Sequence, residues 1–260
     1  MTRIIWNADD IGYSEAVSLG IIKAHRDGLI KSTTMMTNME AAPFAAHLLK
    51  DHPGLYCGQH TNIVVGRPVA NPALLPSLVD EQGYFNVKER LKRGLKLNVE
   101  EIKIEVRAQA ARFQELMGHA PTHIEGHAVQ DPGLKQAIRE VATEMGVHYT
   151  DSEIVWIDGK PVEVIDQHHS GYEVPVRPKV MYYQDTVSVD YWLKDVAGLL
   201  QEDLVEMHTH PGYVDQTLLT LSSYHIPRAK EVAIACDPRV RWWAEDHHVE
   251  FITFEDIRKI

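Results

Sequence analysis

The sequence predicts an α/β fold with a parallel sheet, built as a single domain. Over residues 3–62, apolar runs of strand length alternate with segments whose apolar residues recur at helical spacing. The order strand, helix, strand, helix, strand is typical of right-handed β-α-β units. The 260 residues contain no internal repeat, low-complexity tract or flexible linker. We therefore expect residues 1–260 to form one domain.

Local signals bound the elements of the N-terminal part. Ser14 is a helix N-cap, Gly28 ends that helix, and Pro53 follows the next one. The expected elements are a strand that starts near residue 4, helix 14–28, strand 31–38, helix 41–51 and strand 55–62. Residues 64–85 are rich in Gly and Pro and are expected to form a long loop, a kind of segment that often has a function.

The remaining elements continue the alternation. The expected order is helices 87–93 and 99–117, strand 121–127, helix 131–146, strand 179–183, helix 189–200, strand 203–208, a helix containing Arg228 and Glu231, helix 238–245, strand 249–253 and a terminal helix. Residues 147–178 contain short β-like pieces separated by turn residues, so we expect a strand followed by an excursion from the sheet there.

Composition restricts the class of partner. The formal net charge is −11 and no Lys/Arg-rich run is present, which argues against nucleic acid and anionic membranes and favours a small neutral substrate. No leader or membrane-spanning segment is recognisable, so a soluble, cytoplasmic protein is expected. The two cysteines make neither a disulfide framework nor a zinc motif, and Cys57 is expected to be a buried, inert thiol.

Polar side chains gather where four of the expected strands end. They are Asp9 and Asp10, His60, His127 with Glu125 and His123, and His208 with His210. Successive strands of a parallel barrel bring their C-terminal ends to one face, so these residues are expected to meet. Two imidazoles and a carboxylate suit a divalent ion and leave positions open for water and substrate. A helix-capping role for Asp10, or a hydrogen-bonded structural histidine, explains each residue alone but not all four strand ends.

Position within each strand selects among the histidines. His127 is nearest the tip of its strand and is the expected ligand, whereas His123 lies deeper, in a core or supporting position. Similarly, His210 is expected to be catalytic and His208 to support it.

Several motifs resemble, in order, those of the YdjC-like carbohydrate deacetylases. They are Asn7-Ala8-Asp9-Asp10-Ile11-Gly12, Gly58-Gln59-His60, Thr122-His123-Ile124-Glu125-Gly126-His127, His210-Pro211-Gly212-Tyr213-Val214-Asp215 and the later Tyr224, Arg228 and Glu231. The resemblance covers nearly the whole chain. It implies an irregular (β/α) barrel of the glycoside hydrolase/deacetylase type that removes acetyl groups from N-acetylated sugars with one divalent metal ion.

The resemblance also implies roles for individual residues. The expected metal ligands are Asp10, His60 and His127, and the ion is magnesium or zinc. Asp9 is the expected base and His210 its catalytic partner. We further expect Glu125, Tyr213 and Arg228 to bind the substrate, a small acetylated sugar that is neutral or phosphorylated. A homodimer is the expected oligomer.

Two positions depart from the family pattern. Where family members often have Asp-Ser-His-x-His, this chain has Glu125-Gly126-His127-Ala128-Val129. Val129 in place of the second histidine is expected to change substrate contacts. The longer side chain of Glu125 is expected to change metal affinity.

Other functions compete with metal-dependent amide hydrolysis. A glycoside or phosphosugar hydrolase could pair Asp9 with Glu125 or Glu206, but this leaves the histidines unexplained. His208-Thr209-His210 resembles the His-x-His motif of phosphoesterases and cyclic amidohydrolases, yet that motif normally follows the first strand. A non-enzymatic sugar-binding regulator could use Tyr213, Trp156 and Trp192 for stacking. Serine hydrolases and nucleotide-binding proteins are disfavoured, because no Gly-x-Ser-x-Gly elbow or Gly-rich phosphate loop is present.

Overall fold

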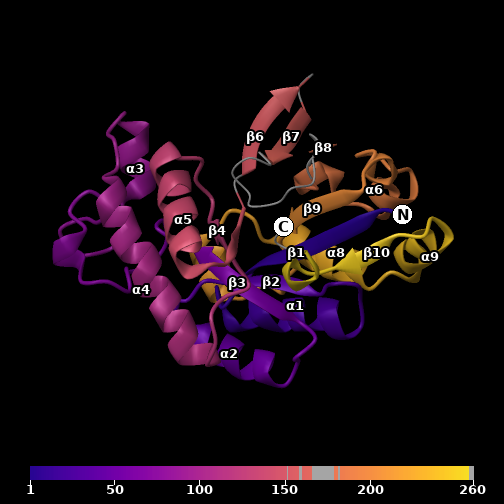
Figure 1. Ribbon diagram of the computed structural model, residues 1–260, viewed down its shortest axis with the longest axis horizontal. Coiled ribbons are helices and arrows are strands. Elements are labelled where there is room, and N and C mark those ends of the chain that lie inside the picture. The colour runs from indigo at the N-terminus through magenta and orange to yellow at the C-terminus, as the bar shows by residue number, and fades with distance from the viewer. Residues whose placement is uncertain (151, 158–159, 166–178, 181, 258–260) are drawn as a thin grey trace.

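A computed structural model describes residues 1–150, 152–157, 160–165, 179–180 and 182–257, and its main sheet is parallel throughout (Figure 1). The sheet has seven strands in the order β10-β1-β2-β3-β4-β5, with β9 also paired to β1. The strands are β1 (Arg3–Ile11), β2 (Ser32–Met35), β3 (Tyr56–Thr61), β4 (His123–Gly126), β5 (His148–Tyr149), β9 (Leu204–Thr209) and β10 (Glu250–Ile252). Every pairing in this sheet is parallel, which confirms the predicted α/β class.

Strand β1 occupies the centre of the sheet. It pairs with β9 from Arg3 to Ala8. Its other edge pairs with β10 over Arg3–Ile5 and with β2 over Asn7–Ile11. Apart from Arg3, every residue of β1 is buried. The carboxylates at its C-terminal end are therefore held by strands on both sides.

The sheet is curled, and side chains from its two edges meet. Thr150, which follows β5, donates a hydrogen bond of 2.6 Å from Oγ1 to Glu206 Oε1 in β9. Since β5 and β9 lie at opposite edges of the sheet, this contact requires strong curvature. The fold is therefore the expected irregular (β/α) barrel, left open between these two strands.

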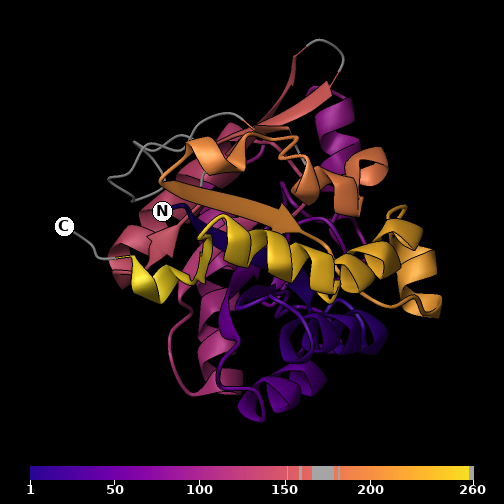
Figure 2. The same ribbon diagram turned by 90° about the vertical axis from the view of Figure 1, so that its right-hand side faces the viewer.

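Helices cover the outside of the curled sheet. They are α1 (Glu15–Arg26), α2 (Ala42–Lys50), α3 (Val87–Lys92), α4 (Val99–Met117), α5 (Pro132–Met145), α6 (Val189–Leu193), α7 (Gln216–Leu221), α8 (Ile226–Ala235) and α9 (Pro238–Asp246). The Ser14 hydroxyl caps α1 by accepting the Val17 N–H, as predicted. Figure 2 views the molecule from the side on which β9 and the C-terminal helices lie. None of the helices described is long and apolar enough to cross a membrane.

Two helix predictions were wrong. The helix expected to reach residue 200 ends at Leu193, because Asp195 has a φ of 45° and the chain turns there. The expected terminal helix is a short 3₁₀ turn at Phe254–Asp256, and residues 258–260 lie outside the described part.

The expected excursion is a small antiparallel sheet of β6 (Ser152–Ile157), β7 (Lys160–Ile165) and β8 (Lys179–Val180). The side chain of Trp156, one of the residues considered for sugar stacking, lies outside what the structure describes.

The main core packs around aromatic side chains behind β1. Trp6 and Trp192 pack with ring centroids 4.2 Å apart and planes tilted by 34°. Trp192 is fully buried, so it is a core residue and is not exposed for the sugar stacking that the regulator alternative considered. Cys57 is also buried, and burial raises the pKa of its thiol, which agrees with the predicted inert role.

Candidate metal centre and active site

The backbone at the end of β1 brings two consecutive carboxylates to one site. Side chains normally alternate between the two faces of a strand, which would separate Asp9 from Asp10. Here the pairing with β2 shifts register between Ala8 and Ile11, and Asp10 has a φ of 76°. Aspartate tolerates this left-handed conformation better than most residues. Both carboxylates consequently reach the polar cluster at the C-terminal end of the sheet.

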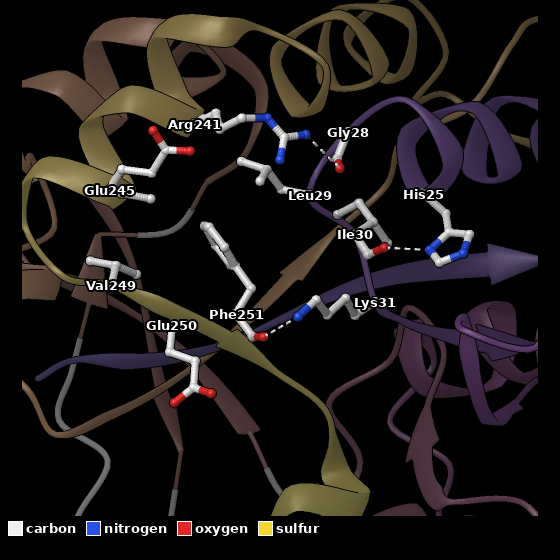
Figure 3. A pocket seen from close by; sticks show the side chains of 11 residues that line it. His25, Gly28, Leu29, Ile30, Lys31, Arg241, Glu245, Val249, Glu250 and Phe251 are labelled. Carbon is white, nitrogen blue, oxygen red and sulfur yellow. Dashed lines mark hydrogen bonds between the residues drawn. The ribbon is translucent and has the colours of Figure 1, made fainter.

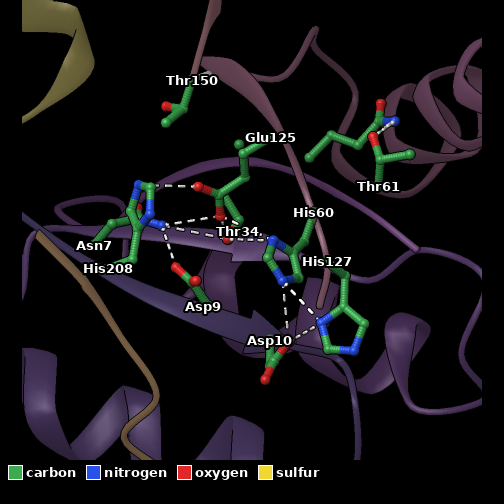
Figure 4. Close-up of polar contacts among 12 residues, drawn as sticks. Asn7, Asp9, Asp10, Thr34, His60, Thr61, Glu125, His127, Thr150 and His208 are labelled. Carbon is green, nitrogen blue, oxygen red and sulfur yellow. Dashed lines mark hydrogen bonds and ion pairs between the residues drawn. The ribbon is translucent and has the colours of Figure 1, made fainter. Parts of the chain in front are cut away.

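Three side chains converge on one point, which we call the Asp10 group: Asp10, His60 and His127 (Figure 4). Asp10 Oδ1 lies 3.2 Å from His60 Nε2 and 3.1 Å from His127 Nδ1. The two imidazole nitrogens are 3.1 Å apart. All three residues are buried. The structure thus brings together the three predicted ligands, which come from β1, β3 and the residue after β4.

The spacing of the Asp10 group fits a divalent cation. Ligands about 2.0–2.1 Å from a tetrahedral ion lie about 3.3 Å from one another, close to the separations found here. Asp10 Oδ1 is buried, and the two imidazole nitrogens lie 3.1 and 3.2 Å from it without forming a hydrogen bond of good geometry. A buried carboxylate oxygen without a hydrogen bond is costly, and a cation between the three atoms would remove that cost. The donor set of two imidazoles and one carboxylate suits zinc and related ions.

Arg228 holds the other oxygen of Asp10. Its Nη2 donates a 2.6 Å hydrogen bond to Asp10 Oδ2, and both residues are buried. Burial alone would raise the pKa of Asp10, but the Arg228 guanidinium and the two imidazoles outweigh it and lower the pKa well below its usual range. Asp10 is therefore ionised, as a metal ligand must be.

Glu125 lies behind His60, on the side away from the Asp10 group. Its Oε1 is 2.9 Å from His60 Nδ1, and it also accepts a short hydrogen bond from the Thr34 hydroxyl. Burial would lower the pKa of His60, but the contacts with Asp10 and Glu125 raise it to about 10. A carboxylate on the far nitrogen of a histidine orients the ring toward a metal. Glu125 is therefore positioned to orient the His60 ring.

Asp9 and His210 face each other beside the Asp10 group. Asp9 Oδ2 lies 3.8 Å from His210 Nε2, and Asn7 Nδ2 donates a 2.8 Å hydrogen bond to Asp9 Oδ1. Burial and the charge of Glu125 raise the pKa of Asp9 well above its usual range. Burial lowers the pKa of His210 to about 3, so this imidazole is neutral. Asp9 can therefore hold a proton, whereas His210 carries no extra proton in the free protein.

The loop after β9 is fixed to α8 and α1. The His210 backbone N–H donates a 2.5 Å hydrogen bond to Glu231 Oε2, and the Tyr224 hydroxyl donates to Glu231 Oε1. Gly212 packs against α1 at Gly20, where an added Cβ would lie 2.5 Å from the Gly212 Cα. Only glycine allows this approach, which fixes the position of the loop carrying His210.

A second group of potential ligands, Asp9, Glu125 and His208, adjoins the first. One ligand atom from each lies within 4.8 Å of the others. His208 Nε2 lies 2.8 Å from Glu206 Oε1 and 3.3 Å from Glu125 Oε2. A cavity of about 40 Å³ next to them is lined by all three residues and by Val129.

Two predicted residues lie away from this centre. His123 is buried, stacks on Phe254 with centroids 3.5 Å apart, and has a pKa lowered by burial to about 3, which matches the expected core position. Tyr213 lies against the start of α1, where its backbone N–H donates a 3.2 Å hydrogen bond to the Ala16 carbonyl. Its substrate-binding role stays a prediction, without a contact to the site among the described residues.

Sequence reasoning missed Thr34 and the role of Asn7. The Asn7 amide lies within hydrogen-bonding distance of Asp9, Thr34 and Glu125, so it connects the acids of the site. Asn7 stood inside the first motif. Thr34 stood in a run of β-branched residues that indicated only a strand.

A larger cavity, of about 390 Å³, lies at the opposite end of the sheet (Figure 3). Residues before β2, at the start of β10 and in α9 line it, among them Lys31, Phe251 and Arg241. Lys31 Nζ donates to the Phe251 carbonyl and Arg241 to the Gly28 carbonyl. These cations are therefore already hydrogen-bonded to the backbone.

The fold and site together define an α/β-barrel protein with a carboxylate–histidine cluster that could hold a metal ion at the C-terminal ends of its strands. The chain belongs to the family of YdjC-like proteins, which it matches over residues 3–246. The predicted family resemblance is confirmed.

Relatives and a solved structure match over the full length. The chain is 33% identical to "Carbohydrate deacetylase 2" of Listeria innocua, covering 99% of each chain, and 32% identical to "Carbohydrate deacetylase" of Brevibacillus brevis, covering 98% of this chain and 99% of that protein. The crystal structure of a putative cellobiose-phosphate cleavage protein from Enterococcus faecalis has a TM-score of 0.80 and 25% identity, with 98% of each chain covered.

Proposed function

We propose that this protein is a metal-dependent carbohydrate deacetylase that hydrolyses the N-acetyl amide of a small amino sugar, neutral or phosphorylated. The observation that carries the proposal is the Asp10 group, with Asp9 and His210 directly beside it. The names of the full-length relatives support the same reaction.

Asp10, His60 and His127 would hold the ion in this proposal. When bound, the ion would polarise the amide carbonyl and lower the pKa of a water molecule. Arg228 keeps Asp10 ionised and in place through a contact to the oxygen that the two histidines do not approach. Glu125 orients His60 from behind. Both residues thus act on the ligands, and this is the role we propose for them in place of direct substrate binding.

Asp9 is the proposed base. Its raised pKa allows it to take a proton from the attacking water. His210 is neutral in the free protein, so it carries no proton for the departing amine at the outset. The carboxyl of Asp9, 3.8 Å away, is the nearest proton source. We propose that the proton passes from Asp9 through His210 to the amine, which cannot leave as an anion.

The paired-carboxylate alternative has weaker support. Glu125 is buried and its Oε1 already contacts His60 and Thr34, so this carboxylate is not available to flank a glycosidic bond. The four histidines near Asp9 and Asp10 would also have no role in such a reaction.

Acetate release tests the proposal. Protein stripped of metal is supplied with Zn²⁺, Mn²⁺, Mg²⁺ or no ion, and then incubated with N-acetylglucosamine oligomers and their phosphorylated forms. We expect acetate only when an ion is present and none from the His127→Ala variant. Release of reducing sugar or phosphate without acetate would refute deacetylation and favour glycosidic or phosphoester cleavage. The single-domain architecture and the homodimer are separate predictions that this experiment does not address.

A further inference from the structure

A compact cluster of buried titratable side chains lies beside the Asp10 group. We call Asp9, Glu125 and His208 the Asp9 cluster; each is at least 91% buried. Glu206, 3% exposed, directs Oε1 to His208 Nε2 at 2.8 Å. Its Oε2 is buried and accepts no hydrogen bond from the residues described. A buried carboxylate oxygen without a donor requires a positive partner.

The charge count of the whole centre leads to the same requirement. Five carboxylates are buried here, those of Asp9, Asp10, Glu125, Glu206 and Glu231, whereas Arg228 is the one Lys or Arg side chain buried in the described part of the chain. A divalent ion on the Asp10 group would still leave two negative charges. Among the described residues, protons on the carboxylates or on His208, or a second divalent ion, would balance them.

The geometry favours an ion. One ligand atom from each member of the Asp9 cluster lies within 4.8 Å of the others, and His208 Nε2 lies 3.3 Å from Glu125 Oε2. The adjoining cavity of about 40 Å³ is lined by these three residues and Thr150. A water molecule takes about 30 Å³, so the cavity has room for a ligand water. Figure 4 shows Asp9, His208 and Glu125 on one side of His60, with His127 on the other.

We propose that the Asp9 cluster, together with Glu206, is a second divalent-cation site, distinct from the Asp10 group. Two carboxylates and one imidazole from the Asp9 cluster, with Glu206 beside His208, suit Mn²⁺ or Zn²⁺. Asp9 has two oxygens, so ligation through one leaves the other facing His210. The proposal does not rest on deacetylation, because metal binding is measured directly.

The test is metal stoichiometry with Mn²⁺ alone as the probe. The full chain is stripped with a chelator, titrated calorimetrically and, after buffer exchange, analysed for bound manganese. We expect two equivalents in the wild type. His127→Ala should lose one and keep the other, and His208→Ala should show the reverse pattern.

A conservative variant and a matched control distinguish ion binding at the Asp9 cluster from nonspecific binding to acidic residues on the surface. Glu206→Gln keeps the shape and the acceptor for Thr150 but removes the charge, and it should weaken the second equivalent at least about tenfold without changing the first. Glu250→Gln changes an exposed glutamate at the opposite end of the sheet and should change neither. Near-UV circular dichroism establishes that each variant is folded.

Two outcomes would overturn the proposal. One equivalent in the wild type would mean that protons balance the Asp9 cluster, whatever the variants do. A second equivalent that is undiminished in Glu206→Gln would be adventitious surface binding. Failure of deacetylation with two equivalents still bound would reject the proposed reaction but not this site.

Discussion

The two ends of the same parallel sheet differ in whether their charged side chains are buried or exposed. At the C-terminal ends of the strands, charged groups are buried and face one another across 2.6–3.8 Å. At the N-terminal ends, Lys31 and Arg241 are exposed and donate to backbone carbonyls. The larger cavity is at this second end, about 390 Å³ against about 40 Å³. Buried charge that neighbouring residues do not fully compensate is therefore a better guide to the reactive end than cavity size.

Removing a ligand should have the largest effect. Asp10→Asn keeps a side chain that tolerates the left-handed backbone but removes the charge, so tight metal binding should be lost and kcat should fall at least about 10³-fold. Acetate release and bound metal would be measured together. Wild-type activity in this variant would show that the buried charges at the C-terminal end of the sheet do not mark the reactive end.

Removing the proposed base should lower the rate without preventing metal binding to the Asp10 group. Asp9→Asn is expected to lower kcat about 10²–10⁴-fold, because proton transfer from water is lost. Mn²⁺ binding to the Asp10 group should change by less than about threefold, since Asp9 is outside this ligand set. Loss of both properties together would show that Asp9 serves the first ion and is not an independent base.

Neutralising the residue behind His60 should have an intermediate effect. In Glu125→Gln the amide oxygen can still accept from His60 Nδ1, but the negative charge is gone. Metal affinity of the Asp10 group should fall about 10–100-fold. Calorimetry at several ion concentrations measures this change. If kcat recovers at saturating ion, Glu125 is an orienting residue; a higher KM with unchanged metal affinity would restore the substrate-binding assignment.

Changes at the opposite end should have the smallest effects. Lys31→Ala removes one hydrogen bond to the Phe251 carbonyl, at a cost of about 1 kcal/mol or less. Thermal unfolding should shift down by no more than about 2–4 °C, and kcat should stay within about twofold. A large loss of activity would show that the N-terminal end of the sheet also contributes to catalysis.

Local signals predicted most of the fold and the gathering of polar side chains at the ends of the strands. The choice of Asp10, His60 and His127 as metal ligands came from the family resemblance, and their role stays a prediction. What could not be predicted was how Asp9 and Asp10 share one site, because strand alternation separates neighbours. The register shift in β1 and the positive φ of Asp10 resolve this, and neither has a sequence signal of its own.

Long-range partners were the other missing information. Glu125 was expected to touch substrate, but its contact with His60 depends on the register between β3 and β4. The short helix α6 similarly depends on a left-handed turn at Asp195, which has no glycine to mark it.

The contact between Arg228 and Asp10 joins residues 218 positions apart in the chain. During synthesis, Asp10 is made 218 residues before its guanidinium partner. Domains fold as units once such distant segments are present. We therefore expect a nascent chain that stops before α8 to lack the Arg228 contact that holds Asp10, so that the proposed ion site is completed only after α8 has been made.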